Sequence, residues 1–302
     1  MKVVYGHTDS IYVEMPMDKT AETLAILNNH VRGLFPNLLE LEEHPVTLEF
    51  EKYYQSLGVG ITKNRNAGLI SWKDGKYLDE PEFVMTGFSA KRVAITGLAK
   101  EIQLQILKDW VGGKSEEEIT ADLKTQYNHV LNGKYDIKKL INRSRFRPER
   151  FEYKCKKCNK KYDMPSAVNQ HKVFSTSYCG KCGESLVLVT EQGKNPSIGA
   201  GVEGIVWYNQ VMDNAIDDSY VYIKAIDDVK REKYIHPITG VAKRPTYIAA
   251  QTMDELIDLC KPDLHHYADS IIKKALPIYK AMNWDTGPIK QDVSQTQLDE
   301  WW

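Results

Sequence analysis

Residues 2–14, KVVYGHTDSIYVE, decide how the start of this chain folds. Alternating and β-branched residues predict two strands, VVY and IYVEM, and the glycine and aspartate between them predict a tight turn. Such a turn holds the carboxylate of Asp9 rigidly at the edge of a sheet. Carboxylate oxygens are ligands that Mg²⁺ prefers, and two-metal phosphoryl transfer depends on such ligands. On spacing alone, however, an aspartate that merely forms the turn is the commoner explanation.

The sequence after this hairpin predicts an α+β fold. A helix is expected over residues 19–35, and an antiparallel sheet over 46–86 from the segments VTLEFEKYY, LGVGIT, AGLISW and EFVMTG, with a turn at Asp74 and Gly75. Ser115 and Glu118 form a capping-box pattern before a helix. The later expected elements are helices near 95–111, 116–131, 199–213, 252–260 and 265–282, and a strand with the sequence YVYIKAI.

The composition is that of an ordinary globular protein. The chain has 302 residues, 42% of them hydrophobic and 27% charged, with a formal net charge of -1, so it can bury a sizeable core. The sequence contains no apolar run long enough to span a bilayer, and the opening MKVVYGHTDS lacks the apolar region of a secretory signal. We therefore expect an intracellular protein without a membrane partner.

Basic residues are concentrated between positions 143 and 182. The lysines and arginines of this stretch are Arg143, Arg145, Arg147, Arg150, Lys154, Lys156, Lys157, Lys160, Lys161, Lys172 and Lys181. Its acidic residues are Glu149, Glu152 and Asp163. A basic patch on a nearly neutral protein indicates a polyanionic partner, although a solvated surface explains the charge equally well.

The segment YGHTDS at residues 5–10 resembles motif C of family B DNA polymerases, usually Tyr-Gly-Asp-Thr-Asp-Ser between hydrophobic strands. The resemblance implies that Asp9 is a catalytic metal ligand and that Thr8 and His7 belong to the same catalytic turn. His7 departs from the family, which has an aspartate there. Because a neutral imidazole lacks the negative charge, the sequence leaves catalytic competence open.

Two further segments match the family in order. EFEKYY and KNRNAG resemble its Glu-x-x-Tyr and Lys-Lys-Arg-Tyr-Ala segments, which implies that Lys63 and Arg65 face the primer–template. Asn64 and Asn66 depart from that pattern. GFSAKR at 87–92 resembles the Gly-x-x-x-x-Arg-Arg stretch entering the first thumb helix, which implies that Lys91 and Arg92 contact primer phosphates. A solvated strand face is the alternative for the first pair.

The resemblance also implies a domain organisation. Residues 1–86 would form the C-terminal part of the palm, 87–284 a mostly helical thumb, and 285–302 a flexible tail. The exonuclease, fingers and remaining palm motifs of a complete family B enzyme are not among these residues. One carboxylate cannot hold two Mg²⁺ ions, so we expect inactivity alone and a larger polymerase subunit as partner, as in split archaeal or viral enzymes.

Four of the five cysteines form two pairs, Cys155 with Cys158 and Cys179 with Cys182. Doubled CxxC spacing in an intracellular chain predicts a closed tetrahedral site for structural Zn²⁺ in a zinc ribbon inserted near residues 151–190. An iron–sulfur cluster is the main competitor. His171 is expected at the surface, and Cys260 as a core thiol. The basic surface of the insert could extend the grip on duplex DNA. The alternative is that the insert only stabilises the thumb.

The chain ends in QTQLDEWW, in which Gln295, Leu298, Trp301 and Trp302 match Gln-x-x-aliphatic-x-x-aromatic-aromatic. Exposed tryptophans at a terminus favour a binding role, and the pattern is similar to the PCNA-interacting box of replication proteins. Packing of the two tryptophans back on the thumb is the alternative.

Together these features predict the small subunit of a split DNA-directed DNA polymerase, a nucleotidyltransferase of DNA replication. Its expected cofactors are Mg²⁺, shared with the larger subunit, and structural Zn²⁺. Its expected partners are that subunit, primer–template DNA and a PCNA-type sliding clamp, in the nucleoid-associated cytoplasm of an archaeal cell or a virus-infected host. The alternatives are a non-catalytic DNA- and clamp-binding subunit, in which His7 marks lost activity, and a zinc-ribbon regulator, which leaves the motif C strands unexplained.

Overall fold

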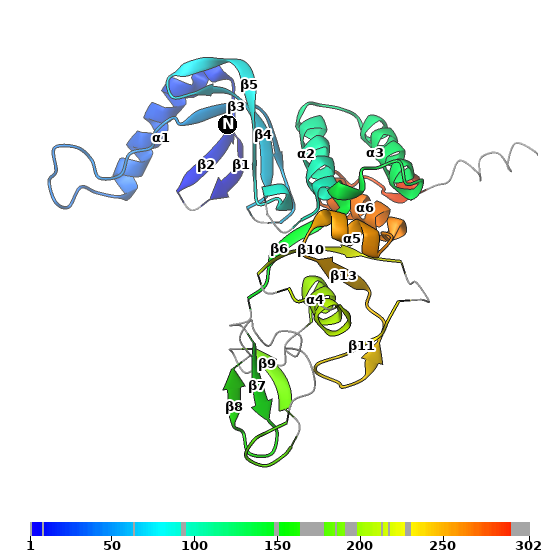
Figure 1. The fold of residues 1–302 in the computed structure, drawn as a ribbon. Helices are drawn as coiled ribbons and strands as arrows, with labels where there is room; N and C mark the ends of the chain where they lie inside the picture. Colours follow the sequence, from blue (N-terminus) through cyan, green and yellow to red (C-terminus); the bar gives the residue numbers. More distant parts are fainter. Residues whose placement is uncertain are drawn as a thin grey trace, which may run out of the picture. The chain divides into compact units, whose positions relative to one another are not determined.

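The computed structural model describes residues 2–7, 9–62, 64–91, 95–147, 151–163, 178–184, 186–190, 198–212, 214–216, 218–226 and 231–290 (Figure 1). The chain divides into two compact units. The first comprises Met1–Phe88, Gln105–Ile119 and Leu276–Asp285, and the second comprises Ser89–Leu104, Thr120–Ala275 and Thr286–Trp302. Helices α2 (Gly97–Val111), α3 (Glu116–Leu131) and α6 (Leu264–Met282) contribute residues to both units.

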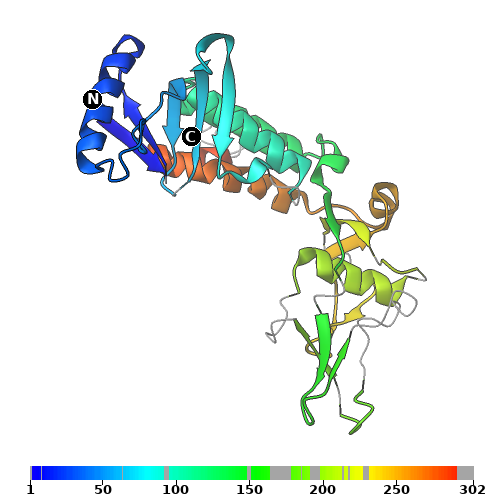
Figure 2. The same ribbon diagram turned by 90° about the vertical axis from the view of Figure 1, so that its left-hand side faces the viewer.

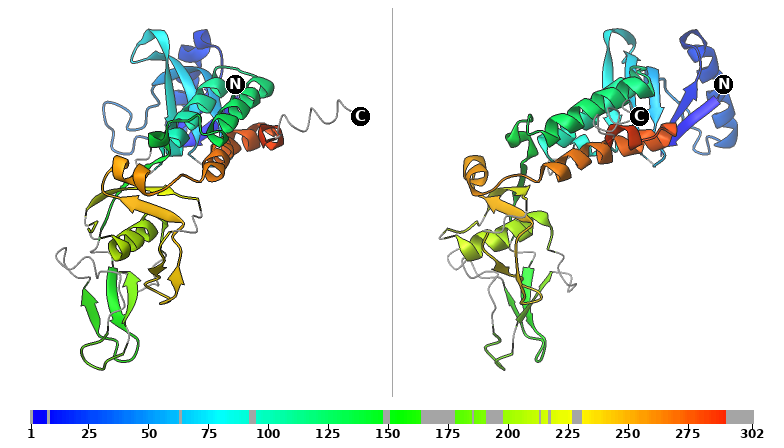
Figure 3. Two further views of the ribbon diagram at one scale, coloured as in Figure 1. Left: turned by 45° about the vertical axis from the view of Figure 1, so that its right-hand side comes forward. Right: turned by 90° about the vertical axis from the view of Figure 1, so that its right-hand side faces the viewer.

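The first unit opens with the predicted hairpin. Strands β1 (Lys2–His7) and β2 (Ser10–Glu14) pair antiparallel, with His7 opposite Ser10. A single 3₁₀ turn, η1 (Met17–Lys19), leads into α1 (Thr20–Leu34), which confirms the helix expected over 19–35. Helix α1 lies beside the hairpin in each view (Figures 1, 2 and 3).

The expected antiparallel sheet is present as β3 (Lys52–Val59), β4 (Asn66–Lys73) and β5 (Lys76–Thr86), with β4 in the centre (Figure 2). The turn between β4 and β5 has positive φ at both Asp74 (52°) and Gly75 (83°), as a two-residue hairpin with an Asp-Gly turn requires. The strand expected from VTLEFEKYY begins later than predicted. Because Lys52 already pairs with the last residue of β4, residues 47–51 have no strand beside them in the described sheet.

Helix α2 packs on this sheet through Trp110. A Cβ added at Gly58 of β3 would lie 2.4 Å from the Trp110 ring, so the absence of a side chain there lets the helix approach. The predicted capping box at the start of α3 is confirmed: Ser115 N–H donates to Glu118 Oε2 at 2.8 Å, and Glu118 N–H donates to Ser115 Oγ at 3.3 Å.

The second unit contains a sheet that the sequence reading missed. Its strand order is β13 (Tyr247–Ala250), β10 (Ser219–Lys224) and β6 (Asn142–Arg145), all antiparallel. Helix α4 (Ala200–Val211) covers one face of it (Figures 1 and 3), and Gly204 allows its close approach because an added Cβ would lie 2.8 Å from the backbone of Ala249. The expectation of a mostly helical part after residue 87 therefore omitted a central sheet.

The remaining described elements are short or frame this sheet. They are η2 (Ser89–Lys91), η3 (Ile137–Leu140), β11 (Tyr234–Ile235), β12 (Ala242–Lys243), α5 (Met253–Leu259) and α7 (Gly287–Lys290). Helices α5 and α6 confirm the two helices expected near 252–260 and 265–282. No helix in the described ranges is long and apolar enough to cross a membrane.

The cysteine-rich insert forms its own small sheet in the second unit. Strand β7 (Phe151–Cys155) lies between β8 (Lys161–Asp163) and β9 (Leu186–Thr190), and both neighbours run antiparallel to it. Tyr153 and Leu188 face each other in register, and both are buried. We call the described residues 151–163, 178–184 and 186–190 the ribbon.

Candidate functional site

The first candidate site lies at the end of the β1–β2 hairpin. His7 ends β1, Asp9 follows in the turn, and both are exposed. The Asp9 carboxylate accepts a hydrogen bond from the Ser10 hydroxyl at 3.4 Å. An exposed carboxylate with lone pairs open to solvent suits a hard cation such as Mg²⁺, but it supplies a single anionic ligand. Asp9 could therefore supply one ligand of a metal site.

The hairpin is held against β3 by aromatic residues. The Tyr12 ring lies 5.2 Å from the Tyr5 ring and 5.8 Å from the Tyr54 ring, measured between centroids. The Tyr53 hydroxyl donates to the Met15 carbonyl at 3.4 Å. Burial raises the pKa of the Tyr54 hydroxyl, and the neighbouring Tyr12 raises it further. These contacts attach the candidate metal ligand to the three-stranded sheet.

The turn between β3 and β4, residues 60–65, meets the same hairpin. Tyr5 donates from its hydroxyl to Asn64 Oδ1 at 3.4 Å, across 59 residues of sequence. The turn itself is closed by Gly60 N–H donating to the Arg65 carbonyl at 2.8 Å, and Asn64 has φ of 62°. The structure thus brings the YGHTDS segment and the KNRNAG segment together, as the resemblance implies.

Gly87 brings the third segment to this turn. Its φ is 76°, and an added Cβ would lie 1.9 Å from the Asn64 carbonyl oxygen and 3.0 Å from Arg65 Cγ. Only glycine tolerates that conformation and that approach together. The start of GFSAKR is therefore packed directly on the turn that carries Arg65.

The segment after Gly87 is positioned by a buried glutamine. Gln103 is 3% exposed, and its Oε1 accepts from Ala90 N–H at 2.7 Å and from the Ser89 hydroxyl at 2.9 Å. Lys274 of α6 donates to the same hydroxyl at 2.9 Å. These bonds fix η2, the 3₁₀ turn that ends at Lys91, on helices α2 and α6.

Several predicted site residues lie outside the described residues. They are Thr8, Lys63, Arg92, His171, Gln295, Leu298, Trp301 and Trp302. Lys91 is placed in η2 by its backbone. The clamp-binding tail and half of the expected DNA-binding residues therefore stay predictions.

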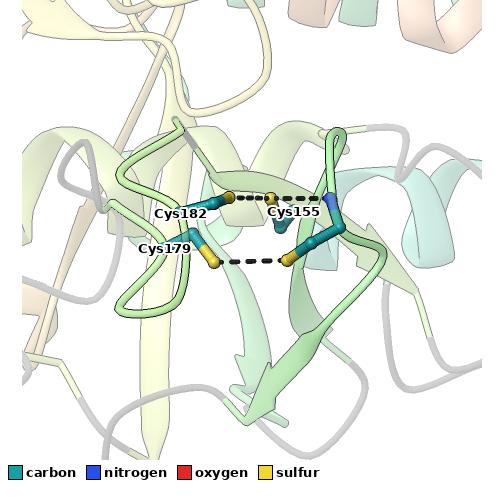
Figure 4. A group of neighbouring side chains, drawn as sticks. Cys155, Cys179 and Cys182 are labelled. Carbon is teal, nitrogen blue, oxygen red and sulfur yellow. Dashed lines mark hydrogen bonds between the residues drawn. The ribbon is translucent and has the colours of Figure 1, made fainter.

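The second candidate site is the cysteine cluster, where all four predicted cysteines come together (Figure 4). Their Sγ atoms lie within 4.8 Å of one another. Cys155 Sγ is 3.4 Å from Cys182 Sγ, and Cys158 Sγ is 3.5 Å from Cys179 Sγ. A tetrahedral ion about 2.3 Å from each sulfur would separate the sulfurs by about 3.8 Å. The donor set therefore fits one tetrahedral metal ion, whereas an iron–sulfur cluster distributes the four sulfurs over two or more irons and spreads them further.

Neighbouring donors stabilise the thiolate form of two of the four cysteines, Cys179 and Cys155. The Tyr162 hydroxyl lies 3.2 Å from Cys179 Sγ, and this hydrogen bond lowers the pKa of the Cys179 thiol to about 6 while it raises the pKa of Tyr162. Cys158 N–H donates to Cys155 Sγ at 3.4 Å, which lowers the pKa of the Cys155 thiol. Cys260, the fifth cysteine, is distant in sequence from these four and directly follows the last residue of α5. Burial raises the pKa of its thiol to about 11.

Three of these residues escaped the sequence reading. Tyr5, Gln103 and Tyr162 act through hydrogen bonds to positions 59, 13 and 17 residues away. Tyr162 lies only four residues after Cys158, but this proximity in sequence does not predict its contact with Cys179. Tyr5 and Gln103 left no signal in the sequence, because their partners are set by the tertiary fold.

Comparisons with known proteins point to one family. A sequence model described as DNA polymerase family B matches residues 1–244. A DNA polymerase of Archaeoglobus fulgidus is 26% identical over 140 residues, and the DNA polymerase zeta catalytic subunit of Arabidopsis thaliana is 26% identical over 141 residues. Each of these matches covers 46% of this chain, but they cover 16% and 7% of the relatives. The matched segments thus span less than a fifth of the length of these relatives.

A solved structure shares the fold. The family B DNA polymerase from the hyperthermophilic archaeon Pyrobaculum calidifontis aligns with a TM-score of 0.50 at 17% sequence identity. The alignment covers 92% of this chain and 26% of that chain.

Proposed function

The chain belongs to DNA polymerase family B, whose sequence model matches residues 1–244 of 302, and from this premise we propose that it forms the C-terminal palm and the thumb of a DNA-directed DNA polymerase. The palm would comprise residues 1–86, the thumb 87–284, and the tail 285–302. The observation that carries the proposal is the meeting of three separate segments. The YGHTDS hairpin, the turn with Arg65 and the GFSAKR segment converge through Tyr5, Asn64 and Gly87.

In this proposal Asp9 holds catalytic Mg²⁺ together with carboxylates of a larger subunit. The bound Mg²⁺ would neutralise developing charge and activate the primer 3′-hydroxyl for in-line attack on the α-phosphate of a nucleotide. The work of this chain's own residues is positional. The hairpin presents Asp9 at a fixed place beside the sheet because Tyr12 of β2 packs against Tyr5 of β1 and against Tyr54 of β3.

The basic segments would hold the primer–template. Arg65 lies against Gly87 in the turn between β3 and β4, Lys63 is two residues before it in the sequence, and Lys91 and Arg92 follow Gly87 in the sequence. Contacts from lysine and arginine to backbone phosphates fix the duplex without reading its sequence. Such contacts are what a polymerase requires, because it must accept any template.

Zn²⁺ is the metal that we assign to Cys155, Cys158, Cys179 and Cys182. A closed site of four thiolates with tetrahedral spacing is typical of structural zinc. The tail, through Gln295, Leu298, Trp301 and Trp302, would tether a PCNA-type sliding clamp; its sequence pattern supports this role.

A larger subunit carrying the exonuclease, fingers and remaining palm is proposed because the first unit exposes an unusual amount of apolar surface. Seven side chains on or near the hairpin and α1 are at least half exposed: Val3, Ile11, Ile26, Leu34, Phe35, Leu38 and Leu39. No residue of α1 is fully buried. Exposed apolar side chains gathered on one part of a chain favour an interaction site, and an isolated two-stranded hairpin is marginally stable without further strands. The rest of a family B palm is the occupant that the family relationship suggests.

Primer extension tests the proposal. The chain is assayed with Mg²⁺ or Mn²⁺ alone, with the larger subunit, and with that subunit after His7→Asp. We expect no extension by the chain alone and extension by the assembly. Extension by the chain alone would contradict the need for a second subunit, and inactivity of both assemblies would contradict the polymerase assignment.

His7 supports one alternative, a non-catalytic subunit that keeps the DNA grip and the clamp tether. Its imidazole stands where the family has a carboxylate, which removes negative charge from the metal site. If only the His7→Asp assembly extends primers, this alternative replaces the catalytic proposal.

A further inference from the structure

The ribbon has more lysines than acidic residues. Its described residues contain Lys154, Lys156, Lys157, Lys160, Lys161 and Lys181 against Glu152, Asp163 and Glu184. Five of these lysines, all except Lys154, are exposed. A zinc ion with four thiolates has a net charge of about −2, so part of this charge offsets the metal centre, and the position of each lysine matters.

Some of the lysines have partners within the ribbon. Lys161 Nζ forms an ion pair with Glu152 Oε2 at 2.7 Å, and Lys160 Nζ lies 5.1 Å from the centre of the Tyr162 ring. Lys156, Lys157 and Lys181 take part in none of the ion pairs or cation–π contacts in the described part of the chain. These three ammonium groups are therefore available to an anion from outside the chain.

The same three lysines occupy the two turns that hold the metal. Lys156 and Lys157 are the middle residues of the first CxxC pair, and Lys181 is a middle residue of the second. Because the four Sγ atoms lie within 4.8 Å of one another, the two turns face each other at one end of the ribbon (Figure 4). The cysteine cluster thus brings together the two turns that carry these three lysines.

An aromatic residue stands next to this group. Tyr178 directly precedes Cys179 and is 69% exposed. Exposed aromatic rings interleaved with lysines are the arrangement by which proteins bind nucleic-acid strands, since the ring stacks on a base while the cations contact phosphates.

We propose that the ribbon binds the phosphodiester backbone of DNA through Lys156, Lys157 and Lys181, with Tyr178 as a stacking surface for an unpaired base. The identity of the polyanion as DNA rests on the proposed function; the site uses none of the four residues Lys63, Arg65, Lys91 and Arg92. The ribbon then extends the DNA contact of the chain to a second, metal-ordered surface.

The test is DNA binding by the full 302-residue chain loaded with Zn²⁺, measured by fluorescence anisotropy with labelled single-stranded and duplex oligonucleotides over a salt series. The variant K156Q/K157Q/K181Q should bind at least several-fold more weakly, with the slope of log K against log[salt] reduced by roughly 2–3, since each lost phosphate contact removes about 0.9 on duplex and about 0.7 on single strands. The variant K76Q/K134Q/K243Q removes the same charge from exposed lysines elsewhere and should retain the wild-type slope.

Y178A should weaken binding of the single strand more than that of the duplex. An equal effect of Y178A on both, or none, would overturn the stacking role. Wild-type affinity and slope in K156Q/K157Q/K181Q would overturn the proposal.

Lysine acetylation of the wild-type chain keeps the proposal testable if the triple variant loses its metal. DNA should protect Lys156, Lys157 and Lys181 from acetylation, as read by mass spectrometry, while Lys76 stays reactive. If these lysines only neutralise the metal centre or contact a protein, DNA leaves them unprotected and the proposal fails. None of these readouts depends on catalysis, so an inactive polymerase assembly would not affect them.

Discussion

At the scale of single residues, the segment that begins at Gly87 depends on close contacts that tolerate little change. Gly87 and Gln103 illustrate two forms of this constraint. Position 87 excludes any side chain, because the Asn64 carbonyl occupies the space that a Cβ would need. Gln103 supplies one oxygen that accepts hydrogen bonds from two donors of η2. Both act on the segment that leads to Lys91 and Arg92, so small changes there should alter DNA binding without touching DNA.

Gly87→Ala should be strongly destabilising. The added Cβ meets backbone at 1.9 Å, and φ of 76° is also unfavourable for alanine, so we expect a loss of more than about 2 kcal/mol in the free energy of unfolding. Gly75→Ala is the matched control, because Gly75 has φ of 83° and no atom within 4 Å of an added Cβ. Its cost should be about 1 kcal/mol, from conformation alone. Urea denaturation measures both, and equal losses would contradict the steric argument.

Gln103→Ala should weaken primer–template binding. The change leaves the buried N–H of Ala90 without its acceptor, which costs about 1–3 kcal/mol of stability, and it frees the segment carrying Lys91 and Arg92. We expect a several-fold higher Kd for duplex DNA in anisotropy measurements. Gln105→Ala on the same helix removes a hydrogen bond to Asp109 and no contact to η2. An unchanged Kd in Gln103→Ala would show that η2 does not position the DNA-binding residues.

At the scale of elements, local signals predicted most helices and the first sheet, and they failed where long-range pairing decides. The Asp74–Gly75 turn and the Ser115 capping box act within four residues, so they are readable from sequence. Strand β6, with the sequence NRSR, has no apolar alternation and exists because it pairs with β10 some 75 residues later. The four clustered cysteines were predictable because the spacing within each pair is local. The contact between Tyr5 and Asn64 was not, because 59 residues separate the two.

The ribbon should depend on its metal, while the first unit should not. Its described strands have three to five residues, too few to be stable without the cysteine cluster. Chelation, or Cys155→Ser, should expose the ribbon to limited proteolysis and leave the β3–β4–β5 sheet intact. Cys260→Ser should retain the metal, as measured by metal analysis of the purified chain. A ribbon that resists protease after complete metal removal would contradict this dependence.

At the scale of the whole molecule, the exposed apolar residues beside the hairpin predict an interface. Leu38→Ser with Leu39→Ser should weaken binding to the larger subunit at least ten-fold, because the two side chains are 85% and 79% exposed and so contribute little to the isolated fold. Val241→Ser, at 55% exposure in the second unit, is the control. Calorimetric titration measures the affinity, and an unchanged value in the double variant would place the interface elsewhere.

The same uncovered leucines have a consequence for the cell. A chain that displays Leu38 and Leu39 to water before it finds its counterpart presents the surface that chaperones and proteases recognise in unassembled proteins. Synthesis in excess of the larger subunit should therefore lead to rapid degradation. The steady-state amount of this chain would then follow the supply of its counterpart, so the two would stay in equal number without matched transcription.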